Sequence, residues 1–212
     1  MADKTQALIS ILKLQPVIPV LVITDLAHAV PLARALVAGG LKAIEITLRT
    51  PVALEAIRAV ADEVEGAVPG AGTVLNAHQF HQAVAAGSQF IVSPGTTQEL
   101  LDVARKSPVP MLPGAATPSE VMALREEGYE VLKFFPAEQA GGAAYLKSLS
   151  SPLAGTLFCP TGGITPDNAR DYLSLSNVIC VGGSWVAPTA LVEAGDWDGI
   201  TRLATEASRL SA

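Results

Sequence analysis

The chain has 212 residues, of which 50% are hydrophobic and 5% aromatic, and its formal net charge is -6. This length fits one large α/β domain that buries its core without disulfides or metal ions. The acidic balance argues against a nucleic-acid partner, although a local cationic site can still hold an acidic ligand.

The N-terminal segment MADKTQALISILKLQPV predicts a short helix at about residues 4–14. The segment lacks the continuous apolar stretch and the small-residue cleavage site of a signal peptide. No apolar run reaches the roughly 18 residues that suggest a membrane span. Cys159 and Cys180 do not have the spacing of a zinc or redox motif. We therefore expect no membrane partner, reduced cysteines in the core and a cytoplasmic location.

Eight short runs rich in β-branched residues follow along the chain at intervals of 20 to 26 residues. The predicted strands are residues 17–23, 42–47, 67–73, 89–93, 109–113, 130–135, 156–160 and 178–182. Alanine-rich amphipathic segments lie between them, such as LAHAVPLARALVAGG, TPVALEAIRAVADEV, NAHQFHQAVAAG and TPSEVMALREEG. Several begin at Asn, Thr or Asp and end at Gly, which are the usual start and stop signals of helices.

This alternation favours a parallel sheet, and eight such units favour a closed (β/α)8 TIM barrel over an open doubly wound sheet. No linker or change of composition divides the chain, so we expect a single domain over residues 1–212. The first helix would be an extra cap on the N-terminal mouth of the barrel. Polar residues near the C-terminal ends of barrel strands converge on one site. At the predicted strand ends these residues are Glu45, Thr47, Thr73, Ser93, Lys133, Thr161 and Ser184.

Glu45 and Lys133 are charged residues inside otherwise apolar strands, in AIEITLRT and EVLKFFPA. Because side chains alternate along a strand, both should point into the barrel if their large apolar neighbours face the helices. A buried charge is unfavourable unless it is paired, so the two form either a satisfied ion pair or a catalytic pair. A desolvated lysine can attack a ketone and form a Schiff base, while a carboxylate transfers protons. Together they indicate class I aldolase chemistry, which requires no metal.

Two Gly-Gly pairs follow the last two predicted strands, in CPTGGITPDN and CVGGSWVAP. One pair alone usually marks a tight turn, but barrels commonly bind phosphate through backbone N–H groups at these two strand ends. We therefore expect a phosphate site there. Arg49 follows the second strand and is either a surface charge or a carboxylate-binding residue, because its planar donors match a carboxylate.

Two other motifs are weaker. GAGTVL begins like a dinucleotide-binding fingerprint, but Leu75 stands where the third glycine should be. His78 and His81 lie three residues apart on a predicted outer helix without a third ligand, which favours solvated histidines over a metal site. We expect neither a cofactor nor a bound metal.

Seven motifs, in order and over nearly the whole chain, resemble those of the 2-keto-3-deoxy-6-phosphogluconate (KDPG) aldolases. They are EITLRT, GAGTVL, VSPG, LPGAATPSE, LKFFPA, PTGGI and GGSW. Members of this family often act also as 4-hydroxy-2-oxoglutarate (KHG) aldolases. The resemblance implies cleavage of a phosphorylated keto acid, KDPG, to pyruvate and glyceraldehyde 3-phosphate, the last carbon–carbon scission of the Entner–Doudoroff pathway. KHG would give pyruvate and glyoxylate. The resemblance also implies a homotrimer that works without a cofactor.

The resemblance further implies roles for residues that match the family motifs. Lys133 would form the Schiff base, and Glu45 would shuttle protons through a water molecule. Arg49 and Thr73 would hold the pyruvyl carboxylate.

The remaining roles concern the rest of the substrate. Pro94 and Phe135 would be apolar walls, and Thr161 would lie near the reacting carbon. The phosphate would be held by Gly162, Gly163 and Ser184.

Two other functions are compatible with the same fold. A sugar-phosphate epimerase or isomerase would need a second acid–base residue opposite Glu45, and none of the strand-end residues named above is an aspartate or a histidine. A barrel that only binds sugar phosphates or a protein partner would not need Lys133 and Glu45.

Overall fold

Parallel strands alternate with helices along residues 2–210, the part of the chain that the computed structural model describes. The strands are β1 (Val17–Leu21), β2 (Ala43–Thr47), β3 (Val68–Gly72), β4 (Phe90–Val92), β5 (Met111–Leu112), β6 (Gly114–Ala115), β7 (Val131–Phe134), β8 (Leu157–Pro160) and β9 (Val181–Gly183). They form a six-stranded sheet in the order β5-β4-β3-β2-β1-β9 and a three-stranded sheet in the order β6-β7-β8. All pairings within these sheets are parallel, so the predicted α/β class is confirmed.

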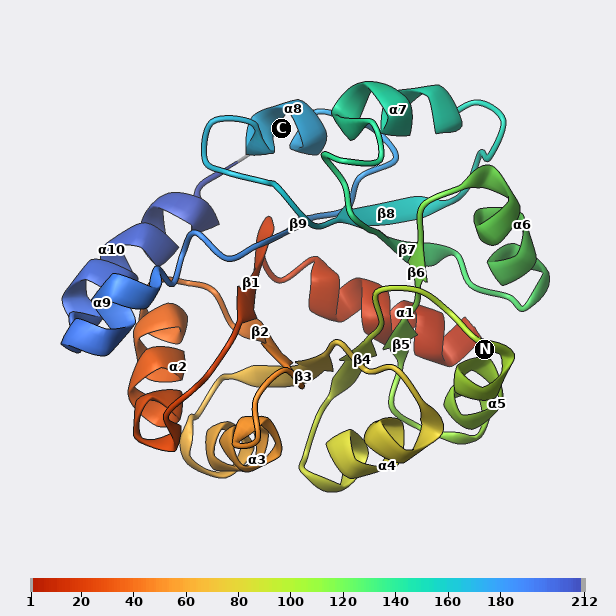
Figure 1. Cartoon of the computed structure of the whole chain (residues 1–212). Helices are drawn as coiled ribbons and strands as arrows, with labels where there is room; N and C mark the ends of the chain where they lie inside the picture. Colours follow the sequence, from red (N-terminus) through yellow and green to blue (C-terminus); the bar gives the residue numbers. More distant parts are fainter. Residues whose placement is uncertain (1, 211–212) are drawn as a thin grey trace.

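The helices that follow the strands lie around the outside of the strands in Figure 1. In chain order the helices are α1 (Ala2–Leu12), the short 3-10 helix η1 (Leu26–His28), α2 (Ala29–Ala38), α3 (Ala53–Glu63), α4 (Ala77–Ala85), α5 (Gln98–Lys106), α6 (Pro118–Glu126), α7 (Gly142–Leu149), α8 (Ala169–Leu173), α9 (Thr189–Ala194) and α10 (Trp197–Ser208). The first helix therefore begins and ends two residues earlier than predicted.

Side-chain caps begin several helices, as the sequence predicts. Asn76, Thr97 and Asp196 each accept a hydrogen bond from a backbone N–H in the first turn of the helix that follows. Thr117 and Glu120 form a reciprocal capping box at the start of α6. Each cap stabilises its helix by about 1 kcal/mol. The caps thereby determine where these helices begin.

Pro113 divides the fifth predicted strand. Proline has no backbone N–H, so it cannot donate to a sheet ladder. Met111–Leu112 pairs with β4, whereas Gly114–Ala115 pairs with β7. The sequence analysis missed β6 for this reason. The last strand also begins later than predicted, because Val178 forms only an isolated bridge with Phe158.

The two faces of each strand pack against different partners, as the alternation of side chains predicts. Ile44 and Leu132 belong to the large apolar cluster that the strands share with the helices. Ala43 and Val131 belong to a smaller cluster formed by the opposite faces of the strands. The charged residues of β2 and β7 stand two positions further along and share the parity of Ala43 and Val131.

Helix α1 packs against this smaller cluster through Leu8 and Leu12. In Figure 1 it lies in the middle of the view, between the strands of the two sheets. Ala43 and Val131 are the first residues of β2 and β7. Helix α1 therefore lies near the N-terminal ends of these strands, away from their C-terminal ends.

No helix within residues 2–210 is long and apolar enough to cross a lipid bilayer. Cys159 and Cys180 are buried in the smaller cluster and form no disulfide. Burial raises the pKa of the Cys180 thiol well above its usual value, and contact with Cys159 adds to the effect. Both cysteines have the predicted place in the core.

Candidate active site

The two charged residues that the sequence analysis selected meet in the interior. Glu45 of β2 and Lys133 of β7 are each 3% exposed. Lys133 Nζ donates a hydrogen bond to Glu45 Oε1 at 3.2 Å. Because β2 and β7 belong to different sheets, this contact links the two sheets across the interior.

Stability alone is a poor explanation for this buried pair. Desolvation offsets the attraction between buried charges, so replacing such a pair by apolar residues is often neutral or stabilising. The Phe135 ring is also close to the amine, with its centroid 5.5 Å from Lys133 Nζ. An amine in apolar surroundings, with a carboxylate that can accept its proton, is suited to nucleophilic chemistry.

Two glycines of β3 make room for neighbouring side chains. A Cβ at Gly72 would lie 2.6 Å from Glu45 Cδ and closer still to Oε1. At Gly70, two positions earlier on the same face of β3, a Cβ would lie 2.5 Å from ring atoms of Phe90. The glycines of GAGTVL are therefore explained by the packing of Glu45 and Phe90 against β3.

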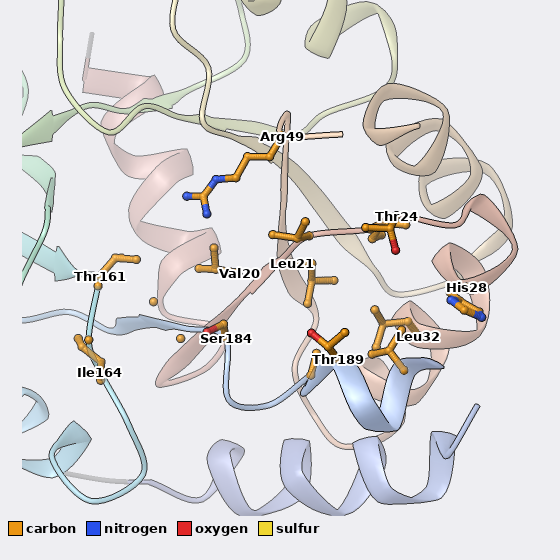
Figure 2. A pocket seen from close by; sticks show the side chains of 18 of the residues that line it. Val20, Leu21, Thr24, His28, Leu32, Arg49, Thr161, Ile164, Ser184 and Thr189 are labelled. Carbon is orange, nitrogen blue, oxygen red and sulfur yellow. The ribbon is translucent and has the colours of Figure 1, made fainter. Parts of the chain in front are cut away.

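Arg49 and Thr73 meet at the C-terminal ends of β2 and β3. Arg49 Nε donates a hydrogen bond to Thr73 Oγ1 at 3.0 Å. Thr73 has a φ of 57°, a region that β-branched residues rarely occupy and that costs about 1–3 kcal/mol. Strain of this kind is typical of functional sites. Figure 2 shows that the Arg49 side chain extends toward Thr161, over a cavity at the C-terminal ends of the strands.

A cavity of about 440 Å³ lies at the C-terminal ends of β1, β8 and β9, which is a typical size for a small-molecule site. Six of the predicted site residues border it: Arg49, Phe135, Thr161, Gly162, Gly163 and Ser184. Phe135 connects the cavity to the buried pair, because its ring also contacts the Lys133 amine. The structure therefore brings these six residues together around one cavity, and their roles remain a prediction.

The other four predicted residues are not among those that line the cavity. Glu45 and Lys133 form the buried pair, and Thr73 is connected to the cavity through Arg49. Pro94 is half-buried after β4, and its backbone packs closely against Gly114. Since Gly114 pairs with Lys133, Pro94 lies near the lysine rather than near the glycine-rich end.

The Gly162-Gly163 loop offers free hydrogen-bond donors to the cavity. The two glycines have φ values of 104° and 75°, a left-handed conformation that suits glycine. Within residues 2–210, the N–H groups of Gly163 and Ser184 have no hydrogen-bond acceptor, whereas the parallel bridge between Thr161 and Gly182 turns the Gly162 N–H toward β9. The Thr161 hydroxyl is buried and also lacks a partner among the described residues. Backbone N–H groups without an acceptor in such a turn can bind an anion.

The histidines that the sequence analysis set aside lie elsewhere. His78 and His81 are exposed on α4. Within residues 2–210, no three His, Cys, Asp or Glu side chains are grouped so that they could hold a metal ion.

Comparison with known proteins identifies the family. A sequence model of the family described as KDPG and KHG aldolase matches residues 8–203. The chain belongs to this family. It is 52% identical over 198 residues to the KHG/KDPG aldolase of Escherichia coli strain K12, and the match covers 93% of each chain. The resemblance read from the seven motifs is thus confirmed.

Solved structures of KDPG aldolases have the same fold. One is the enzyme of Legionella pneumophila with pyruvate captured at low pH as a covalent carbinolamine intermediate. It has a TM-score of 0.92 and 46% identity, and the match covers 94% of this chain and 97% of that one. Another is the enzyme of Zymomonas mobilis ZM4 with 3-phosphoglycerate. Its TM-score is 0.90 at 52% identity, with 96% of each chain covered.

Some cavity residues of this aldolase-family chain were not predicted. They come from the end of β1 and from the region of η1, α2 and α9: Val20, Leu21, Val22, Ile23, Thr24, His28, Leu32, Thr189, Val192 and Glu193. A search for polar residues at strand ends does not select an apolar end such as that of β1.

Proposed function

We propose that this chain is a class I aldolase that cleaves KDPG to pyruvate and glyceraldehyde 3-phosphate through a Schiff base on Lys133. The observation that carries the proposal is the buried contact between Lys133 and Glu45, close to a cavity with a guanidinium and a loop of free N–H groups. KDPG has a ketone, a carboxylate and a phosphate. The Lys133 amine, the Arg49 guanidinium and the glycine-rich loop would bind them in that order. The carbinolamine captured in the Legionella pneumophila enzyme is the precursor of such a Schiff base.

The reaction begins with the Lys133 amine. Glu45 Oε1, at 3.2 Å, accepts a proton from it, and the neutral amine attacks the C2 ketone. Loss of water gives a protonated imine, which withdraws electrons from C3. Removal of the C4 hydroxyl proton by Glu45 then breaks the C3–C4 bond and releases glyceraldehyde 3-phosphate. Protonation of the remaining enamine at C3, followed by hydrolysis, frees pyruvate and the lysine.

The remaining groups orient the substrate. Arg49 is held by Thr73 and binds the pyruvyl carboxylate together with it. Phe135 and Pro94 form apolar walls that exclude water from the imine. Thr161, whose hydroxyl has no partner within the described residues, is next to the reacting carbons.

A second reaction follows from the same chemistry. KHG shares the keto acid end of KDPG, so its aldol cleavage gives pyruvate and glyoxylate with the same residues. The name of the Escherichia coli relative includes both substrates, which supports this dual activity. KHG has no phosphate, so it does not depend on the glycine-rich end of the cavity.

Ser184→Ala tests the phosphate site formed by Gly162, Gly163 and Ser184. A hydrogen bond to a charged group contributes about 1.5–3 kcal/mol. We therefore expect kcat/KM for KDPG to fall about ten- to a hundredfold, while that for KHG and the trapping of pyruvate hardly change. Steady-state kinetics with both substrates measure the contrast. Equal losses for KDPG and KHG would show that Ser184 does not recognise phosphate.

Gly163 is less suitable for the same test. A Cβ there would lie 2.7 Å from Glu138 Cβ and Cγ, and the backbone φ is 75°. A Gly163→Val variant would therefore be strained before any ligand bound, so its loss of activity would not isolate the phosphate contact.

Gly72→Ala tests whether Glu45 must occupy the space beside β3. The added methyl group overlaps the carboxylate, so Glu45 must move away from Lys133. Because a misplacement of about 1 Å can cost on the order of 10²-fold, we expect kcat for both substrates to fall ten- to a hundredfold. Gly95→Ala is the control, since the φ of this glycine is not in the left-handed region and a Cβ there would have no neighbour within 4 Å. Equal kinetics for the two variants would contradict the role of Gly72.

The architecture that we propose is a closed (β/α)8 barrel forming one domain over residues 1–212. Bridges between Phe158 and Val178 and between Thr161 and Gly182 connect β8 to the β9 segment, and β5 and β6 act as one strand interrupted at Pro113. Helix α1 then caps the N-terminal mouth. Family resemblance supports a homotrimer, and the buried, unbridged cysteines support a cytoplasmic location.

The alternative functions fit the site less well. An epimerase or isomerase needs a second acid–base residue opposite Glu45, and the group in that place is the Lys133 amine. A protein that only binds ligands gives no reason for a buried ion pair next to the cavity.

The decisive experiment is the incubation of the protein with pyruvate and borohydride, followed by intact mass measurement. We expect one reduced pyruvate per chain, together with release of glyceraldehyde 3-phosphate from KDPG in a coupled dehydrogenase assay. A protein that releases no product and shows no mass increase is not an aldolase of this type.

A further inference from the structure

The segment that follows β7 is hydrogen-bonded to the Gly162-Gly163 loop. Ala137 N–H donates to Thr161 O at 2.9 Å, and Glu138 N–H donates to Gly162 O at 3.1 Å. The Glu138 side chain also packs closely against Gly163. A Cβ at Gly163 would lie 2.7 Å from Glu138 Cβ and Cγ. Glu138 therefore contacts both glycines of the loop.

The Glu138 carboxylate is held by a buried tyrosine. Tyr172 of α8 is 1% exposed, and its hydroxyl donates a hydrogen bond to Glu138 Oε1. Burial, and then the contact with Glu138, raise the pKa of Tyr172, so the hydroxyl stays protonated at neutral pH. Tyr172 is therefore a permanent donor to this carboxylate.

The position of this carboxylate matters because the loop offers free donors beside it. A carboxylate and a phosphate compete for the same backbone N–H groups, and that of Gly163 has no acceptor within residues 2–210. If Glu138 lost its partner, its carboxylate could turn toward the loop and bind there. Its charge would also repel a phosphate dianion.

We propose that Tyr172 is a positioning residue for phosphate recognition, which keeps the Glu138 carboxylate away from the Gly162-Gly163 loop and so leaves the N–H groups free for the substrate. This proposal rests on the proposed aldolase function. The segment after β7 thus connects the two parts of the site. It follows the strand that carries Lys133, and its residue Glu138 contacts the Gly162-Gly163 loop after β8.

Asn168 supports the same loop from the other side. Its Nδ2 donates to Gly163 O at 3.1 Å, and its Oδ1 accepts from Thr165 N–H at 2.8 Å. The carbonyl groups of Gly162 and Gly163 are thus both fixed by hydrogen bonds, which orients the peptide units between them. The Glu138 carboxylate lies beside this loop, since its stem contacts Gly163.

The test compares Tyr172→Phe with the double variant Tyr172→Phe/Glu138→Gln. The single variant frees a charged carboxylate, and we expect kcat/KM for KDPG to fall about tenfold, mainly through KM, with kinetics on KHG unchanged. The double variant removes the charge, so we expect recovery to within about threefold of wild type. Tyr145→Phe is the matched control, because the Tyr145 hydroxyl makes no hydrogen bond within residues 2–210.

The outcomes separate this inference from the proposed function. A wild-type protein that does not cleave KDPG overturns the aldolase assignment. If wild type cleaves KDPG, then a Tyr172→Phe variant with unchanged KM, or with equal losses on KDPG and KHG, overturns the role of Tyr172. A double variant no better than the single one shows that Tyr172 supports the loop only structurally, and so overturns the competition between carboxylate and phosphate.

Discussion

Lys133→Ala is expected to abolish the trapping of pyruvate by borohydride. It should also lower KDPG cleavage by more than the roughly 10²- to 10⁴-fold that a lost proton-transfer group costs. The imine cannot form without this amine, which lies 3.2 Å from the Glu45 carboxylate. Lys133→Arg should fail equally, because a guanidinium remains protonated. Intact mass and single-turnover kinetics measure both effects.

The control for this prediction must separate lost chemistry from lost folding. Lys133→Ala leaves Glu45 buried without a partner, which can cost about 3–5 kcal/mol of stability. The double variant Lys133→Met/Glu45→Gln removes both charges and should fold while remaining untrapped. Lys42→Ala changes an exposed residue just before β2 and should be trapped like wild type. A fully trapped Lys133→Ala protein would assign the Schiff base to another lysine.

Much of the fold was predictable because each strand could be read locally. The alternation in AIEIT and VLKF places Ile44 and Leu132 against the helices and the charged residues on the opposite face, and the structure has this arrangement. The division of the fifth predicted strand at Pro113 was harder to predict from the sequence. Whether a residue after proline pairs, and with which neighbour, depends on where β4 and β7 lie, and the local sequence does not contain that information.

The candidate site was predictable where polar residues stand at strand ends. Glu45 and Lys133 could be paired from the sequence because both the parity and the strand-end rule select them. The need for glycine at position 72 was missed, because it comes from the Glu45 side chain on the neighbouring strand. Only the structure shows that a Cβ at Gly72 would overlap this side chain. The Tyr172 hydroxyl bond to Glu138 was missed for a similar reason, since the two residues are 34 positions apart.

Glu45→Gln is expected to slow cleavage of both KDPG and KHG by roughly 10²- to 10⁴-fold, the range typical of a lost acid–base group. The glutamine amide is nearly the same size as the carboxylate and can keep a hydrogen bond to Lys133, but it cannot accept a proton. Pyruvate trapping should persist at a reduced rate, because the amine can still attack the ketone after losing its proton to water.

The comparison of trapping with turnover gives this prediction its meaning. Glu45 is enclosed by Lys133 and by the space beside Gly72, so an isosteric change leaves the packing in place, and thermal unfolding should confirm a folded protein. A Glu45→Ala variant instead leaves a cavity and an unpaired ammonium, so it should lose stability as well as activity. Loss of turnover in a folded Glu45→Gln protein that still traps pyruvate would assign proton transfer to Glu45 and imine formation to Lys133. Unchanged turnover in that variant would remove Glu45 from the reaction and leave the ion pair with a purely structural role.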